Sequence, residues 1–200
     1  MVVDASTGET VASGGLADGS PVTTLSRNLV DDLAGGLIEL PGGRKVGRDG
    51  DTTAQVDDDR ILIQTVDGVR LVGLPDLDVI WNAQEDIRLT GIWTEAADLS
   101  TSTVIAFGTD GRIVGLDLET GREKWSSDVP RELVNGLKTQ IGSGVVAFRR
   151  NGKDRLGQVL IDSATGAQLT GANGYVVADQ GLLLEIRNGV ASPVTVADLR

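Results

Sequence analysis

Residues 104–125, VIAFGTDGRIVGLDLETGREKW, read as three short apolar strands separated by two tight turns. The first turn holds an Asp-Gly pair. The second holds the pattern Asp-x-x-Thr-Gly at Asp117, Thr120 and Gly121, and Trp125 follows four residues later. Whether this unit occurs once or is repeated along the chain decides the fold.

The unit has an upstream relative in residues 61–81, ILIQTVDGVRLVGLPDLDVIW. Gly68 of its Asp-Gly pair lies 43 residues before Gly111, and Trp81 lies 44 residues before Trp125. The two Val-Gly-Leu segments begin 42 residues apart. The stretch is therefore one copy of a repeat.

Looser copies lie downstream and at both ends. Residues 145–148, Val-Val-Ala-Phe, follow Val-Ile-Ala-Phe by 41 residues, and residues 181–200 predict an apolar strand, an Asn-Gly turn and a strand that ends at Asp198. Between residues 12 and 60 the pattern fades: 25–37 read as one helical turn or a loop, and 35–43 as a single strand. The Asp-x-x-Thr-Gly turn occurs at Asp4, Thr7 and Gly8, at Asp117, Thr120 and Gly121, and at Asp162, Thr165 and Gly166.

A repeat of about 40 residues with roughly four short strands is typical of a β-propeller blade. The composition agrees, because 27 glycines in 200 residues supply many tight turns and only 3% of residues are aromatic. We therefore predict an all-β fold, a β-propeller of four to five four-stranded blades, forming one domain over residues 1–200. A single sheet cannot bury both of its faces, so each blade must pack against its neighbours.

The recurring residues have structural explanations. Asp-Gly and Asn-Gly pairs suit two-residue hairpin turns. In Asp-x-x-Thr-Gly the carboxylate can accept backbone N–H groups while the glycine takes the left-handed conformation. Trp81 and Trp125 are expected between blades, with the indole N–H directed to a carbonyl. Chemistry seldom recurs three times around a ring, so these positions are predicted to be structural.

Composition excludes several classes of site. The chain has no cysteine and no histidine, which rules out disulfides, thiolate or histidine metal sites and a Ser-His-Asp triad. A formal net charge of −11 disfavours nucleic-acid binding. No run of about eighteen apolar residues and no basic-then-apolar leader is present, so we expect a soluble segment that does not insert into a membrane.

The unit GLDLETGREKW resembles the repeat of the pyrroloquinoline-quinone-type β-propellers, in which a strand, Asp-x-x-Thr-Gly and a tryptophan recur in each blade. The resemblance implies this fold. The quinone dehydrogenases of that family have eight blades, a vicinal cysteine pair and a calcium cluster, which this chain has neither the length nor the cysteines to supply. The similarity is to the non-catalytic members: extracytoplasmic scaffolds, assembly factors and sensor domains of bacterial envelope proteins.

The ends leave two alternatives open, because the chain starts and stops inside a copy. The strand at residues 2–5 could pair with the last strand and close a small five-bladed ring. Alternatively, the chain is a domain cut from a larger envelope protein, which we favour.

Two candidate sites stand outside the repeat. Asp49, Asp51 and Asp57 belong to an acidic segment that could hold Ca²⁺, although Thr53 and Ala54 depart from a calcium-binding loop, and a solvated loop is the preferred interpretation. No other cofactor is expected. Trp93 is a possible ligand contact or a core residue. Four carboxylates lie near Trp93 in sequence: Glu85, Asp86, Glu95 and Asp98. Their presence leaves a glycosidase activity open, but nothing in their pattern points to one.

The sequence thus predicts a non-catalytic binding or scaffolding module that presents its loop faces to a protein or polysaccharide partner outside the cytoplasmic membrane of a bacterium. The alternative is a small-ligand sensor or carboxylate-based enzyme that uses the central channel.

Overall fold

The structure is a computed structural model. The residues it describes are 2–3, 10–12, 23–26, 29–31, 37–39, 44–45, 52–57, 59–65, 67–74, 76–83, 86–89, 96–129, 134–150, 157–179 and 181–200.

The described chain is built from antiparallel sheets in which strands pair in chain order, and we number the five larger sheets as blades I to V. Blade I comprises β3 (Thr23–Ser26), β4 (Leu29–Asp31), β5 (Leu37–Glu39) and β6 (Arg44–Lys45), and blade II comprises β7 (Thr52–Gln55), β8 (Arg60–Thr65), β9 (Gly68–Gly73) and β10 (Asp78–Asn82). Blade III comprises β11 (Ile87–Leu89), β12 (Ala97–Asp98), β13 (Thr103–Gly108), β14 (Ile113–Asp117) and β15 (Glu123–Ser127). Blade IV comprises β16 (Val134–Gly142), β17 (Val145–Arg150), β18 (Gln158–Asp162) and β19 (Gln168–Leu169), and blade V comprises β20 (Tyr175–Asp179), β21 (Leu182–Arg187) and β22 (Val190–Pro193).

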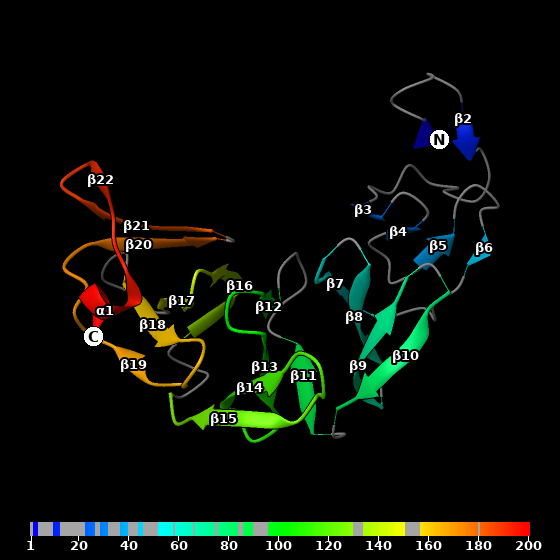
Figure 1. The fold of residues 1–200 in the computed structure, drawn as a ribbon, viewed down its shortest axis with the longest axis horizontal. Helices are drawn as coiled ribbons and strands as arrows, with labels where there is room; N and C mark the ends of the chain where they lie inside the picture. The colour runs from blue at the N-terminus through cyan, green and yellow to red at the C-terminus, as the bar shows by residue number, and fades with distance from the viewer. Residues whose placement is uncertain are drawn as a thin grey trace.

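The blades follow one another along an open arc (Figure 1). β10, β15 and β19 lie on its outer side, and β12 and β16 lie toward its inside. This succession of antiparallel meanders, of which blades I, II and IV have four strands, blade III five and blade V three, confirms the predicted propeller repeat. In blade III the inner strand is split, since β11 and β12 both pair with β13.

Successive residues of a strand belong to two different cores. In β13, Val104 and Ala106 pack between blades II and III, whereas Ile105 and Phe107 pack between blades III and IV. In β17 the same alternation divides residues 145–148 between the III–IV and IV–V junctions. Because each fully buried aliphatic or aromatic side chain contributes about 1.5–3 kcal/mol, these junctions hold the blades together.

The expected two-residue turn is present at Asn188–Gly189. Arg187 pairs with Val190, and both turn residues have positive φ, 53° and 80°. This is the backbone of the type I′ turn for which Asn-Gly is suited.

The expectation of a two-residue turn is wrong at the Asp-Gly pair of blade III. β13 ends at Gly108 and β14 begins at Ile113, so the connection there has four residues, and Gly111 supplies a positive φ of 91° within it. In blade II, Gly68 is the first residue of β9, pairing with Thr65. A dipeptide therefore indicates a turn without fixing its length.

The Val-Gly-Leu segments that helped to reveal the repeat are offset in the structure. Trp125 pairs with Gly115, and Trp81 pairs with Leu71. Aligned on the tryptophans, the two segments differ by two residues. Gly115 lies so close under the Trp125 ring that a Cβ there would clash with it.

The structure corrects both ends of the sequence interpretation. The described residues of the stretch 25–37, predicted as a helical turn or loop, belong to strands β3, β4 and β5, because pairing within blade I determines their conformation. The strand predicted to end at Asp198 instead ends at Pro193. A short helix, α1 (Val196–Leu199), follows, capped by Thr195, whose side chain and that of Asp198 form a capping box.

Ring closure through residues 2–5 is not seen among the described strands. β1 (Val2–Val3) pairs with β2 (Thr10–Ala12), and β22 pairs with β21. The two ends of the arc face each other across an opening (Figure 1).

Candidate functional site

The junction between blades III and IV is built around Trp125 of β15. Its Nε1–H donates to the carbonyl oxygen of Ser163 at 2.9 Å, and the ring is buried. Gly166, with φ of +74°, lies against the ring so closely that a Cβ would come within 2.5 Å of Trp125 Cε3. The tryptophan of one blade therefore docks on the turn of the next.

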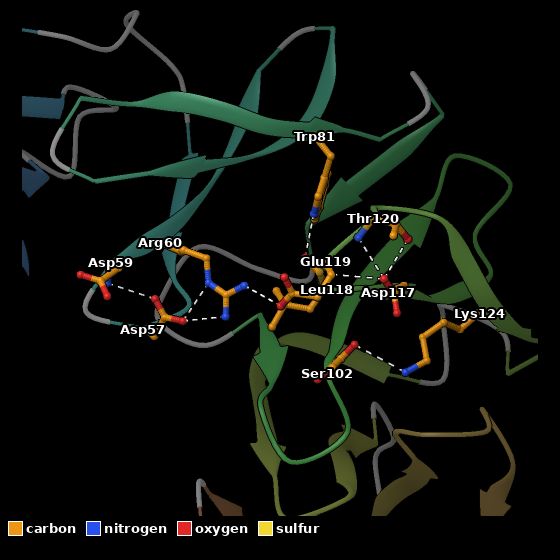
Figure 2. A network of polar contacts seen from close by, with 10 residues as sticks. All are labelled: Asp57, Asp59, Arg60, Trp81, Ser102, Asp117, Leu118, Glu119, Thr120 and Lys124. Atoms are coloured by element: carbon orange, nitrogen blue, oxygen red, sulfur yellow. Dashed lines mark hydrogen bonds and ion pairs between the residues drawn. The ribbon is translucent and has the colours of Figure 1, made fainter.

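The junction between blades II and III repeats this geometry. Figure 2 shows Trp81 Nε1–H donating to the carbonyl oxygen of Leu118, at 2.8 Å. A Cβ on Gly121 would come within 2.7 Å of the indole. Leu118 and Ser163 each directly follow the aspartate of an Asp-x-x-Thr-Gly turn. The turn thus offers a carbonyl and a bare glycine to an indole from the preceding blade.

The aspartate organises each turn. Asp117 Oδ1 accepts the Thr120 hydroxyl at 2.8 Å and the backbone N–H groups of Thr120 and Glu119 at 2.9 and 3.2 Å. These bonds, chiefly that of the Thr120 hydroxyl, lower the pKa of Asp117 below its ordinary value. Gly121 N–H donates to the Asp117 carbonyl at 2.8 Å, closing the turn.

In blade IV the equivalent aspartate has a further partner. Asp162 Oδ1 accepts the N–H groups of Ala164 and Thr165, and its Oδ2 lies 2.7 Å from Nη2 of Arg200. Leu199 beside it packs into the IV–V core, and its carbonyl accepts Gly171 N–H at 2.8 Å. Helix α1 therefore occupies the IV–V junction, where no tryptophan is present among the described residues.

A buried polar cluster joins blades III and IV beside Trp125. Asp98 of β12 has no exposed surface. Its Oδ1 accepts the N–H and hydroxyl of Ser100, and its Oδ2 accepts Gly144 N–H at 2.9 Å and the Ser163 hydroxyl at 2.5 Å. The Thr101 and Ser163 hydroxyl oxygens lie 2.9 Å apart. Oδ1 therefore closes the turn within blade III, Oδ2 joins blade III to blade IV, and the fully buried carboxylate is not exposed to a channel.

An ion-pair network joins blades II and III. Arg60 Nη1 lies 2.7 Å from Oε1 of Glu119, and its Nη2 lies 2.8 Å from Oδ2 of Asp57 (Figure 2). The hydrogen bond to Asp57, and to a smaller extent that to Glu119, raises the pKa of Arg60 above its ordinary value. On the same side, Lys124 Nζ donates to the Thr101 carbonyl at 2.8 Å.

The loops that connect successive strands lie at two opposite faces of the arc, and the contacts described above are made at one of them. Because the strands of each meander alternate in direction, the first and third connections of every blade lie at one face. We call this the turn-motif face. Its described turn residues in blades II to V are 56–57, 59, 74, 76–77, 99–102, 118–122, 143–144, 163–167 and 181. All three junctions are tied together there, including a Ser143 hydroxyl bond to the Asp179 carbonyl at 2.8 Å.

The remaining connections lie at the other face, which we call the open loop face. Its exposed described residues include Asp67, Asp110, Arg112, Asn173 and Asn188. Asp110 and Arg112 pair with each other at 2.6 Å, within a single turn. The described hydrogen bonds of these five side chains stay within one connection or reach one strand of the same blade. The ties between blades nearest this face come from strand residues: the Gln158 side chain bonds the N–H and carbonyl of Val176, and Gln64 Oε1 accepts the N–H of Leu89.

Several residues singled out from the sequence lie outside the described residues: Asp4, Thr7, Gly8, Asp49, Asp51, Glu85, Trp93 and Glu95. Asp57 is described, and its carboxylate accepts the N–H of Asp59 and pairs with Arg60. Asp86 is exposed, whereas Asp98 is fully buried. Sequence reasoning missed the Asp98 cluster and the Arg60–Glu119 pair, since neither follows a repeat or a motif.

The part of the chain that the structure describes contains no group of three or more acidic side chains placed to hold a metal ion. Within the same residues, no helix has the length and apolar character needed to cross a bilayer.

The fold and its tryptophan-on-glycine junctions define a propeller of the pyrroloquinoline-quinone-like repeat type. A family model described as "Outer membrane protein assembly factor BamB" matches residues 2–191, and the chain belongs to this family. No curated protein matches the chain.

Solved structures are similar in fold at low identity. The computationally designed Ika8 protein has a TM-score of 0.54 and 16% identity over 87% of this chain. BamB from Moraxella catarrhalis has a TM-score of 0.46 and 15% identity over 86% of this chain. The chain spans 63% of the Ika8 chain and 56% of the BamB chain.

Proposed function

We propose that this protein is a non-catalytic binding module that holds a protein partner outside the cytoplasmic membrane during outer-membrane protein assembly. The observation that carries the proposal is the match of residues 2–191 to a family with that description. The rigid, repeated junctions support it, because they suit a scaffold that presents loops from a fixed frame.

The open loop face is the surface we assign to the partner. Side chains of the turn-motif face are already engaged: Glu119 with Arg60, Asp98 with Ser163, and Asp162 with Arg200. The open loop face carries exposed polar side chains without such ties, so a partner can bind there without breaking the junctions.

The absence of catalysis is proposed on two grounds. The sequence holds no cysteine or histidine, which removes the common nucleophile–base pairs. Of the carboxylates near Trp93 in sequence, the structure describes Asp86 and Asp98, and Asp98 is the buried one. Its oxygens accept hydrogen bonds from Ser100, Gly144 and Ser163.

Site-specific photo-crosslinking in the organism that carries the protein tests this function. A photoreactive residue is placed at Asp67, Arg112 or Asn188 on the open loop face, and at Glu119 or Ala164 on the turn-motif face as matched exposed controls. Mass spectrometry then identifies the crosslinked species.

The expected result is a protein of the outer-membrane assembly machinery, captured from the open loop face and not from the turn-motif face. If the assembly protein were captured from the turn-motif face alone, the proposed function would stand but the binding surface would be assigned to that face instead. Capture of cytoplasmic proteins only, or of cell-wall polysaccharide from the open loop face, would overturn the proposed function.

A further inference from the structure

Blade V carries an Asn-Gly pair in an exposed turn, at Asn188 and Gly189. The register pairs Arg187 with Val190, so the ladder between β21 and β22 ends where this turn begins. Gly189 has a φ of +80°, and a Cβ built on it would meet no atom within 4 Å. No described residue bonds the Asn188 side chain or the Gly189 N–H. The two groups that would react with each other in such a pair are therefore free.

The exposure of this turn follows from its place in the blade. It connects β21 to β22 at the open loop face, as residues 109–112 connect β13 to β14. Blade III packs against blade II on one side and blade IV on the other, and Thr109 and Asp110 are exposed all the same. The Asn188 turn therefore stays accessible whatever covers the outer side of blade V.

An asparagine followed by glycine can close a ring on its own backbone. The Gly189 nitrogen, after it loses its proton to a base, attacks Cγ of Asn188. The new C–N bond completes a five-membered succinimide, and Nδ2 leaves as ammonia. Water then opens the ring at one of its two carbonyls, which gives aspartate or isoaspartate. One water is consumed and one ammonia is released, and glycine favours the attack because no Cβ crowds its nitrogen.

A second Asn-Gly pair, Asn173 and Gly174, is held in place. Asn173 Nδ2 donates to the carbonyl oxygen of Gly171 at 3.1 Å, and the Asn173 N–H donates to Oε1 of Glu185. A Cβ on Gly174 would clash with the carbonyl oxygen of Ile186, so the neighbouring strand packs directly on this glycine. Ring closure at Asn173 therefore requires these contacts to open first.

We propose that Asn188 is a site of spontaneous deamidation in the folded protein, and that the fold selects it over Asn173. The aspartate product suits the turn, because blades II and III carry Asp-Gly at the corresponding connections. It adds one negative charge to the open loop face. The isoaspartate product adds an atom to the main chain of a two-residue turn, which disturbs the pairing of Arg187 with Val190.

Incubation of the folded chain in mildly alkaline buffer tests the proposal. Peptide mass spectrometry that separates the Asn, Asp and isoaspartyl forms gives a rate for each site, and an isoaspartyl methyltransferase assay measures isoaspartate independently. Asn188 should react at least about tenfold faster than Asn173, since the held segment must open before it can react. In urea the two rates should converge, because both sites are then unfolded Asn-Gly pairs.

Asn188→Gln is the matched control. It keeps a neutral amide but would have to close a six-membered ring, so the modification at this turn should disappear while the rate at Asn173 stays the same. A rate at Asn188 in the folded chain as slow as that at Asn173 would overturn the proposal. So would a rate at Asn188 at least about tenfold below its own rate in urea, since the turn would then protect the pair. The measurement uses the chain alone and does not depend on the proposed partner.

Discussion

Gly166 and Gly121 show how the junctions depend on single residues. Each lies under an indole ring from the preceding blade, with positive φ and no room for a Cβ. Each glycine therefore permits both the positive φ of its turn and the close approach of the indole ring. The contributions of these two effects to stability can be measured separately.

Gly166→Ala is expected to destabilise the protein by about 3 kcal/mol. Roughly 1 kcal/mol comes from a side chain at positive φ, and about 2 kcal/mol from displacing the Trp125 ring. The control is Gly181→Ala, because Gly181 has the same φ of +74° and a Cβ there would meet no atom within 4 Å. Urea unfolding of both variants should separate them, and equal losses would show that the ring contact contributes nothing.

Asp117 makes a contribution that depends on pH. Its native pKa is lowered, mainly by the Thr120 hydroxyl, so the unfolded chain binds a proton more readily than the native one. The contribution is full above the ordinary carboxyl pKa of 3.8 and is lost as the pH falls below it through the native pKa.

Asp117→Asn tests this pH dependence. Unfolding free energies of the variant and the parent chain, measured by urea between pH 7 and pH 2.5, should differ by a constant amount down to about pH 4. Below that pH the difference should shrink. A difference that grows as the pH falls would contradict the proposed role of the charged carboxylate.

At the scale of elements, β12 shows what sequence reasoning could not reach. The repeat predicted the paired strands of blades II, III and IV, because the spacing of Trp81 and Trp125 is visible in one chain. The splitting of the inner strand into β11 and β12 breaks the repeat, and Asp98 meets Ser163 only across 65 residues. Nothing local in the sequence connects those two residues.

The two chain ends illustrate the same limit. Thr195 and Asp198 form a capping box that marks α1, yet the preceding repeats favoured a strand there. The periodicity described blades correctly where neighbouring copies were similar, and it was wrong where a local cap or the pairing of a divergent blade determined the conformation.

Asp98→Ala should cost about 2–4 kcal/mol, because it leaves the Gly144 N–H buried without an acceptor and removes the charged partner of the Ser163 hydroxyl. Hydrogen exchange of Gly144 should accelerate with it. Asp67→Ala, at an exposed turn, serves as the control and should change stability by less than about 0.5 kcal/mol. A loss at Asp98 no larger than at Asp67 would show that the cluster does not hold blades III and IV together.

At the scale of the whole molecule, the junctions rather than a bound ion are expected to supply stability. Asp57, a calcium candidate, is held by Arg60 and the N–H of Asp59. We expect the melting temperature to be the same in millimolar CaCl₂ and in excess EDTA. A calcium-dependent rise of several degrees would show that the acidic segment around Asp49, Asp51 and Asp57 binds the ion after all.

The alternation of buried residues between two cores has a consequence for how the strands find their partners. In a sheet with one wet side, a slip of one residue exposes apolar side chains to water, and solvent itself rejects the error. In β13 both faces are apolar, so exposure to water does not distinguish the correct register from one shifted by a single residue. The tight turns, with their aspartates and glycines, must then carry that information, and errors in them would be corrected slowly.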